Sequence, residues 1–243
     1  MNYKLVFAYD GSKYFGYAVQ KNEEHTVQAV IEKAISTILN KETKIYASGR
    51  TDRGVHALNQ VANFHCDHPL DEAKFLRSLN KLIPNDIYFK KITKVDEKFN
   101  ARFSAIAKEY IYIINYKEYD PFRRAYELLD TKIDYDLLLA TSQIFVGTHN
   151  FQSFTSKPTD DKNFVRTIYS ISFKRKEGRI YIDFKGDGFM TYMIRKIIGA
   201  LLEVNKGNLK TDEILNLLNS KKREIITYTA PPEGLFLKRV YYK

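Results

Sequence analysis

The chain has 243 residues, enough to bury a substantial core in one large or two small domains. Its 39 Lys and Arg residues exceed its 29 Asp and Glu residues, and the net charge of +10 favours an anionic partner such as nucleic acid over an acidic metabolite. The single cysteine, Cys66, excludes an internal disulfide, and no apolar run reaches the roughly 20 residues that span a bilayer, so we expect a cytoplasmic protein.

The first half of the chain predicts the element order βαββαβ. Leu5, Phe7 and Tyr9 alternate with smaller residues, as strand residues do, before a turn at 10–12. Thr26 precedes a run in which apolar residues recur every three or four positions, the pattern of a capped helix lying on a sheet. The predicted elements are a strand at 5–9, a helix at 26–39, strands at 43–47 and 61–64, a helix at 71–82 and a strand at 86–95.

The second half predicts another sheet with helices. A hairpin is expected around Glu177 and Gly178, because apolar residues alternate on both sides of that turn. Residues 117–132 are charged and aromatic without a period and predict a long surface excursion. The helix that begins at Asp134 is expected to end at Gly147 as its C-cap, with Leu137 facing inward. The remaining predicted elements are a strand from 105, a mobile polar loop at 156–163, strands at 165–173 and 180–184, helices at 189–204 and 211–219, and a strand at 235–242.

These elements together predict an α+β fold. No Pro- or Gly-rich linker separates the halves, so we expect two α/β lobes, 1–104 and 105–243, whose antiparallel sheets join edge to edge into one extended central sheet. Helices are expected on one side of this sheet and a cleft for the active site on the other.

The loop within residues 48–64 carries the densest chemistry. Asp52 lies between Arg50 and Arg53, and glycines bracket the group at 49 and 54. Cations this close favour the ionised carboxylate. One interpretation is a surface turn whose aspartate caps its own backbone and makes a weak ion pair. The other is a carboxylate that acts as nucleophile or base beside guanidinium groups that bind phosphate.

The same loop, GRTDRGVHALNQVANF, closely resembles the G-R-T-D-x-G-V-H-A signature of the TruA family of tRNA pseudouridine synthases. The resemblance continues in order along the chain. The further matching segments are YDGSKYFGY, FNARFSAIAKEYIYII, FVGTHNFQSF, GFMTYMIRKIIGALLEV and PPEGLFLKRVYY. The resemblance implies the pseudouridine synthase fold and an isomerase that converts uridine to pseudouridine.

The resemblance also implies roles for individual residues. Asp52 takes the place of the catalytic nucleophile, and Arg50 that of an arginine linked to flipping the uridine out of its helix. Tyr110 corresponds to a tyrosine that stacks on the flipped base, Arg195 to an arginine that ion-pairs the catalytic carboxylate, and Leu235 to an apolar wall of the pocket. From the residues alone, Tyr110 and Leu235 remain open as ordinary core and Arg195 as a snorkelling helix residue.

The reaction itself requires no redox change, so we expect neither metal nor cofactor. His65, Cys66 and His68 fall within four residues of one strand and do not converge as zinc ligands. No serine or cysteine near His56 completes a nucleophilic triad, so His56 is expected to order the loop.

The expected partners are tRNA, whose anticodon stem-loop holds the target uridines in the family, and a second copy of the chain in a homodimer. Three departures from the family pattern, Tyr17, Ala18 and Asn150, bear on RNA contacts, because the first two stand in a turn where the family has Trp and Gln. Alternatives are a paralogue acting on another structured RNA such as ribosomal RNA, an inactive RNA-binding module, and a nucleoside glycosylase or hydrolase that would release free base.

Overall fold

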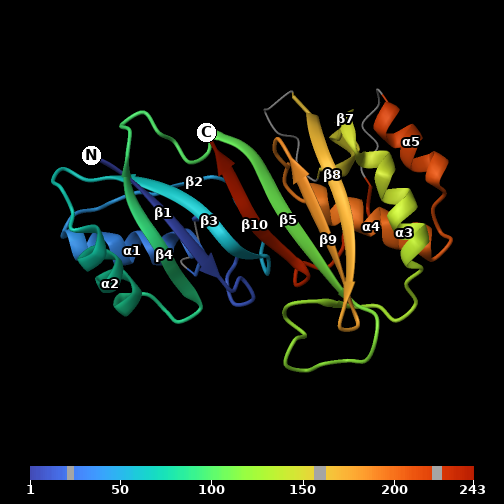
Figure 1. Ribbon diagram of the computed structural model, residues 1–243, viewed down its shortest axis with the longest axis horizontal. Helices are drawn as coiled ribbons and strands as arrows, with labels where there is room; N and C mark the ends of the chain where they lie inside the picture. The colour runs from blue at the N-terminus through green and yellow to red at the C-terminus, as the bar shows by residue number, and fades with distance from the viewer. Residues whose placement is uncertain (21–24, 156–162, 221–225) are drawn as a thin grey trace. The chain divides into compact units, whose positions relative to one another are not determined.

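The computed structural model describes residues 1–20, 25–155, 163–220 and 226–243, and these form two compact units. Unit 1 comprises residues 1–106 and 236–243, and unit 2 comprises residues 107–235. The last strand therefore lies in unit 1, although a division of the chain at 104/105 assigns it to the second lobe. Both units combine helices with mostly antiparallel strands, which confirms the predicted α+β class (Figure 1). The loop predicted at 156–163 lies, apart from Asn163, outside the described residues.

Unit 1 is built on strands in the order β4-β1-β3-β10, with β2 also paired to β3. The pairs of β1 with β3 and β4, and of β2 with β3, are antiparallel, whereas β10 runs parallel to β3 through Phe236 opposite His56. The strands are β1 (Asn2–Tyr9), β2 (Tyr46–Ala47), β3 (His56–His65), β4 (Ile87–Val95) and β10 (Leu235–Tyr242), and the helices are α1 (Val27–Leu39) and α2 (Glu72–Leu82).

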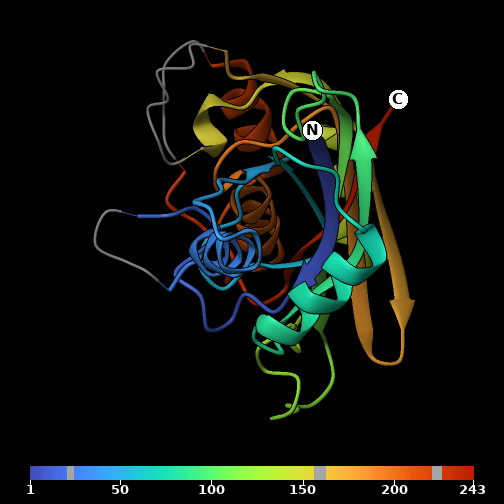
Figure 2. The ribbon, with the colours of Figure 1, turned by 90° about the vertical axis from the view of Figure 1, so that its left-hand side faces the viewer.

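The core of unit 1 forms where alternate residues of the strands meet the apolar helix faces. Tyr3 and Phe64 pair across β1 and β3, and Phe75 of α2 stacks on Phe64 with ring centroids 5.7 Å apart. Figure 2 looks nearly along the axis of α1 and shows the helix beside the strands. Both predicted caps are confirmed, because the side chains of Thr26 and Asp71 accept hydrogen bonds from backbone N–H groups of the first turns.

Unit 2 has the strand order β5-β9-β8-β7, with β6 paired in parallel to β5. Glu177 and Gly178 both have positive φ, 50° and 74°, which the tight turn of a two-residue hairpin requires, and the predicted hairpin is confirmed. The strands are β5 (Ala105–Asn115), β6 (Leu128–Leu129), β7 (Gly147–Asn150), β8 (Val165–Lys176) and β9 (Arg179–Gly186). The helices are α3 (Tyr135–Ser142), α4 (Met193–Asn205) and α5 (Thr211–Asn219), with 3-10 turns at Gln143–Phe145 and Gln152–Phe154.

Two helix predictions in unit 2 are wrong at their ends. The helix that begins after Asp134 stops at Ser142, and Gly147 starts β7 instead of capping the helix, because it pairs with Ile168 of β8. Leu137, predicted to face inward, is 37% exposed. The helix predicted from residue 189 begins only at Met193, because Tyr192 adopts a left-handed conformation with φ 64° just before it.

Strand boundaries in unit 1 also differ from the prediction where long-range pairing decides them. β3 begins at His56 instead of residue 61, since Ala57 pairs with Tyr9 on one side and Leu237 on the other. β2 covers only two residues of the predicted 43–47. The extension of β3 brings the start of the strand directly against the charged loop.

Candidate functional site

The charged loop of unit 1 ends in a tight turn before β3. The Val55 N–H donates to the carbonyl of Asp52 at 3.1 Å, and Gly54 has φ 78°, a conformation that a side chain disfavours. Asp52 is half-buried, whereas Arg50 and Arg53 are exposed. The turn therefore holds a carboxylate at the surface with two guanidinium-bearing residues beside it in the chain.

A buried hydrogen-bond network holds the start of this loop. Gln60 of β3 is fully buried, and its Nε2 donates to the Gly49 carbonyl at 2.9 Å. Its Oε1 accepts from the Ser48 hydroxyl at 2.8 Å. The Tyr9 hydroxyl lies 2.8 Å from the Thr51 hydroxyl, and burial raises the pKa of Tyr9 to about 12, so this hydroxyl stays protonated. The Gln60 amide thus holds the Ser48 side chain and the Gly49 backbone, in the segment that leads to Asp52.

The turn after β1 packs directly against the charged loop. The Gly11 N–H donates to Nδ1 of His56 at 3.0 Å, and a Cβ on Gly11 would lie 2.0 Å from the Val55 carbonyl oxygen, so only glycine fits there. The Tyr17 N–H donates to the Thr51 carbonyl at 3.0 Å. His56 orders this region, as predicted.

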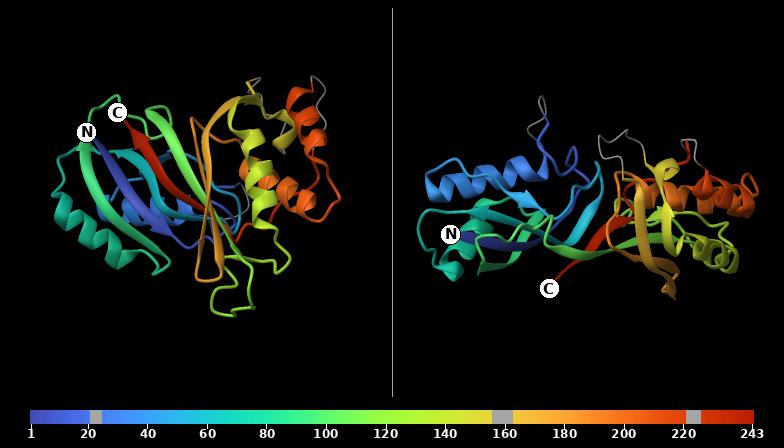
Figure 3. Two further views of the ribbon diagram at one scale, coloured as in Figure 1. Left: turned by 45° about the vertical axis from the view of Figure 1, so that its right-hand side comes forward. Right: turned by 90° about the horizontal axis from the view of Figure 1, so that it is seen from above.

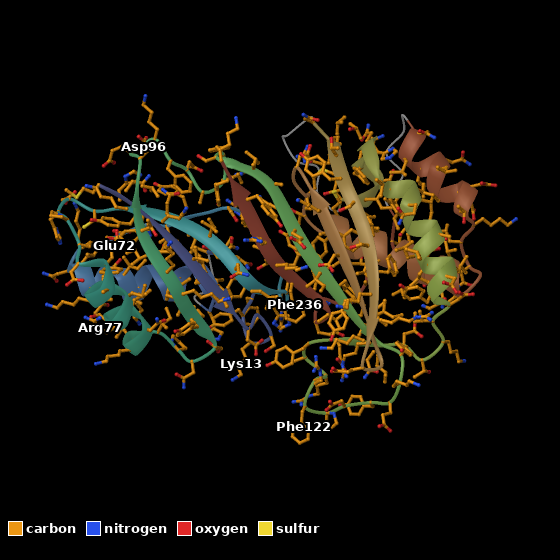
Figure 4. The ribbon with its side chains drawn as sticks, in the orientation of Figure 1. Lys13, Glu72, Arg77, Asp96, Phe122 and Phe236 are labelled. Atoms are coloured by element: carbon orange, nitrogen blue, oxygen red, sulfur yellow. The ribbon has the colours of Figure 1, made fainter. Side chains whose placement is uncertain are left out.

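Two further neighbours complete the surroundings of the His56 ring. Asp10 places a carboxylate oxygen 3.1 Å from Nδ1 of His56, and the same oxygen accepts the Ser12 N–H at 2.9 Å. The ring also stacks on Phe236 of β10, which Figure 4 labels, with centroids 4.6 Å apart. Phe236 thus packs on the imidazole from the last strand, and Asp10 lies beside it in the turn after β1.

The exposed face of the loop carries an aromatic partner for one arginine. The guanidinium of Arg53 lies 4.4 Å from the centroid of the Phe15 ring, a cation–π distance. Both side chains are exposed, so the pair presents a flat cationic surface to solvent next to Asp52. Such a surface suits phosphate and base contacts.

Tyr110 lies on β5 in unit 2. Its ring is buried and meets Phe189 edge to face, with centroids 5.3 Å apart and an interplanar angle of 78°. Tyr110 and Phe189 thus adopt one of the arrangements that aromatic pairs prefer.

Arg195 lies in the first turn of α4, also in unit 2. Its Nε donates to the Ala230 carbonyl at 2.7 Å, and its guanidinium lies 4.9 Å from the centroid of the Tyr192 ring. The Ala230 N–H donates back to the Arg195 carbonyl at 2.9 Å. These contacts fix the guanidinium in one orientation, which a snorkelling side chain does not require.

The segment before Leu235 is fastened to β5. The Tyr112 hydroxyl donates to the Pro231 carbonyl at 2.9 Å, and the Ile113 N–H donates to the Gly234 carbonyl at the same distance. A Cβ on Gly234 would lie 2.9 Å from the Tyr112 ring, so the approach is close. Leu235 is buried at the end of this segment.

The structure thus places Asp52 and Arg50 in unit 1, and Tyr110, Arg195 and Leu235 in unit 2. Sequence reasoning missed the residues that position them. Gln60, Ser48 and Tyr9 hold the Asp52 loop, while the backbone of 230–234 holds Arg195 and Leu235. The available signal was a glutamine beside the apolar run that begins at Val61, because a buried amide must find partners.

His65 ends β3, and Cys66 and His68 follow the strand instead of lying in it as predicted. His65 Nδ1 faces the Glu97 carboxylate at 3.6 Å, while Cys66 Sγ lies 3.9 Å from His68 Nδ1. Within the part of the chain that the structure describes, no group of three or more His, Cys, Asp or Glu side chains is arranged to hold a metal ion. Nor does any helix in the described ranges have the length and apolar character to cross a membrane.

Of the three departures from the expected motifs, Tyr17 is buried, whereas Ala18 and Asn150 are half-buried. Tyr17 is 2% exposed, and its hydroxyl finds no hydrogen-bond partner among the described residues. A residue so buried does not touch RNA, so the reason for expecting a shifted target from Tyr17 is wrong. Asn150 lies in β7, where its side-chain oxygen accepts the Gln152 N–H at 3.0 Å and shapes the local backbone.

Known proteins resemble this chain over nearly its whole length. A family described as tRNA pseudouridine synthase matches residues 5–104 and 141–243. The chain is 41% identical to tRNA pseudouridine synthase A 1 of Protochlamydia amoebophila, a match that covers 99% of this chain and 96% of the relative. It is 39% identical to tRNA pseudouridine synthase A 2 of Bacillus cereus and 38% identical to tRNA pseudouridine synthase A of Acetivibrio thermocellus, with 99% of each chain covered. A solved Cbf5-Nop10-Gar1 complex is similar only at 15% identity and a TM-score of 0.36, covering 81% of this chain and 43% of that one.

Proposed function

This chain belongs to the tRNA pseudouridine synthase family, and from that premise we propose that it converts uridine to pseudouridine in tRNA with Asp52 as the catalytic carboxylate. The observation that carries the assignment is the anchored loop of unit 1. Buried Gln60 and Tyr9 hold the backbone on which a half-buried Asp52 is presented. A surface turn without function would not require such a buried polar support.

The reaction explains why a fixed carboxylate is needed. The bond from the ribose to N1 of uracil must break, the base must rotate, and a bond from the ribose to C5 must form, after which C5 loses its proton and N1 gains one. A carboxylate is a competent nucleophile at such a centre, as in retaining glycosidases. Atoms and electrons balance within the nucleoside, so no external reductant or oxidant enters.

The family resemblance supports roles for the other four residues. Arg50, exposed beside Asp52, suits a phosphate or the space that a flipped base vacates. Tyr110, whose ring lies next to Phe189, takes the place of the stacking tyrosine, and stacking on a base is worth about 1–3 kcal/mol. Arg195, oriented by Ala230, supplies a guanidinium as partner for the carboxylate, and Leu235 supplies apolar surface for the base.

We further propose uridines of the anticodon stem-loop as targets, a cytoplasmic location and a homodimeric state. The names of the relatives support tRNA over ribosomal RNA, and the buried position of Tyr17 removes one reason to expect another target. The lobes 1–104 and 105–243 remain a proposal for the units in which the chain folds.

The test is an assay for the modified nucleoside. We incubate the enzyme with a tRNA transcript containing labelled uridine, digest the RNA and separate the nucleosides. Wild-type enzyme is expected to yield pseudouridine, and free uracil would instead indicate a glycosylase. Asp52→Asn preserves the shape of the side chain but removes its charge, so it is expected to abolish product while binding tRNA within a few fold of wild type. Product formed by Asp52→Asn at the wild-type rate would refute the role of Asp52.

A further inference from the structure

The 117–132 arm, which joins β5 to α3, is tied to unit 2 through one buried carboxylate. Glu127 is buried, and its two carboxylate oxygens accept three hydrogen bonds. The donors are Asn115 Nδ2 at 2.9 Å, Arg123 Nε at 3.0 Å and Arg179 Nη2 at 3.1 Å. β6 pairs in parallel with the end of β5 within the same arm. Charge-assisted bonds of this kind are strong and directional, so the arm has a defined conformation.

The tip of the arm is a hydrogen-bonded turn that exposes aromatic rings. The side chain of Asp120 accepts the Phe122 N–H at 2.9 Å, and the Asp120 carbonyl accepts the Arg123 N–H at 3.1 Å. Phe122 is 89% exposed and Tyr119 is 59% exposed. Figure 4 shows Phe122 at the end of the arm, directed away from the strands. Packing in a hydrophobic core therefore does not explain why a phenylalanine stands at this position.

The arm lies beside the turn of the β8–β9 hairpin, which adds positive charge. The Tyr116 N–H donates to the Gly178 carbonyl at 3.1 Å, and a Cβ on Gly178 would touch the Lys117 side chain. Figures 1 and 3 show the arm and the hairpin turn side by side. The exposed cations around the arm and the hairpin turn are Lys117, Arg124, Lys174, Arg175 and Lys176, and the exposed anions are Glu118 and Glu177. The Arg175 guanidinium packs on the Tyr135 ring of α3, 3.7 Å from its centroid.

We propose that this surface, Tyr119 and Phe122 with the surrounding cations, binds an unpaired nucleotide of the RNA substrate, with Phe122 stacking on its base. The proposal rests on the proposed function, which makes RNA the substrate. Flat rings fixed among cations suit a base and its phosphates, because every base has a face that stacks and every nucleotide carries an anion. An apolar surface of a partner protein would not account for the five cations.

The position of the arm fits a contact outside the reacting nucleotide. Tyr110 and Asn115 lie five residues apart on β5, so the base of the arm is about 16 Å from Tyr110 along the strand. A folded RNA spans that distance. The arm contains none of the five residues proposed to act at the catalytic site, so its contact with RNA is additional to theirs.

The experiment distinguishes a contribution of ring stacking to RNA binding from a contribution of apolar volume alone. Phe122→Leu keeps an apolar side chain but removes the stacking face, and Phe122→Trp enlarges that face. The control is Tyr169→Leu, which also replaces an exposed aromatic ring by leucine. Tyr169 lies on β8, seven residues before the strand ends at the hairpin turn. Equilibrium binding of a tRNA transcript is measured by filter retention at fixed salt, and the oligomeric state of each variant by sedimentation.

We expect Phe122→Leu to weaken tRNA binding about tenfold, within the range found for single stacked bases, while Phe122→Trp and Tyr169→Leu stay within about twofold of wild type. Binding by Phe122→Leu equal to wild type would overturn the proposal and leave a protein partner as the occupant. A change of oligomeric state in Phe122→Leu would also overturn it and identify the tip as an interface between copies. Pseudouridine formation is scored separately, so tRNA binding that depends on Phe122 without product would refute the proposed function and retain the RNA contact.

Discussion

Replacing Gln60 with leucine tests whether the buried network positions Asp52. Leucine has similar volume but offers no polar atoms. The change removes the hydrogen bond of 2.8 Å from the Ser48 hydroxyl, which also has Tyr242 as a partner, and the bond of 2.9 Å to the Gly49 carbonyl. Each buried polar group deprived of its partner costs about 1–3 kcal/mol, so Gln60→Leu is expected to lower the free energy of unfolding by roughly 2–5 kcal/mol.

The same change is expected to slow catalysis beyond its effect on stability. The backbone of 48–51 leads directly to Asp52, and displacement of a reacting group by about 1 Å costs on the order of 100-fold in rate. The assay is a single-turnover measurement with enzyme in excess over tRNA, at a temperature where the variant is folded. The free energy of unfolding is measured in parallel by urea denaturation.

Leu79→Ala is the matched control for destabilisation. Leu79 is fully buried in α2, and truncating a buried leucine costs about 2–5 kcal/mol, the same range as Gln60→Leu. This variant leaves the hydrogen bonds of Gln60 intact. We expect Leu79→Ala to retain the single-turnover rate and Gln60→Leu to lose most of it. Equal rates for the two variants would refute the positioning role of Gln60.

Three further predictions concern tyrosines. Tyr17→Phe is expected to raise the free energy of unfolding by about 1 kcal/mol, because it removes a buried hydroxyl that lacks a partner among the described residues. Urea denaturation measures the change, and a loss of stability would contradict the prediction. Burial raises the pKa of Tyr9 to about 12 and also raises the pKa of Tyr17 and Tyr112, so between pH 10 and 12 the unfolded chain loses protons that the folded chain keeps. Stability should therefore be complete below pH 10 and fall as pH rises above it, which thermal melts across that range check, and a flat profile would be inconsistent with buried tyrosines. Tyr110→Ala should lose most activity in the nucleoside assay while Tyr110→Phe retains the stacking face, and wild-type turnover by the alanine variant would identify Tyr110 as core alone.

Helices that begin at a local capping residue could be predicted from the sequence together with their first residues. The helix after Thr26 and the helix after Asp71 begin at those caps, because the capping oxygen and the apolar period lie within one short segment. The helix after Asp134 shows the limit. Gly147 has the composition of a C-cap, yet pairing with Ile168, 21 residues away, recruits it into a strand. Tertiary pairing outweighs a local preference of about 1 kcal/mol.

The same distinction between local signals and long-range contacts applies to the candidate site. The charges around Asp52 are neighbours in sequence, so their proximity could be predicted, and so could the ordering role of His56. The support of the loop could not, because Ser48 and Gln60 are 12 residues apart and Tyr9 is 51 residues from Gln60. A sequence shows that a strand contains a glutamine but not which polar atoms a fold brings to it.

The support is polar for a physical reason. An apolar contact fixes the separation of two groups but tolerates rotation and sliding, whereas a hydrogen bond also fixes direction, within about 30° of linear. Gln60 uses a donor and an acceptor of one rigid amide on two successive residues, and so restrains the Ser48 side chain and the Gly49 backbone together. Thr51 is held from the other side by Tyr9 and by the Tyr17 N–H. The loop is therefore constrained on both sides of Arg50 immediately before Asp52, as a carboxylate that must meet one ribose carbon requires.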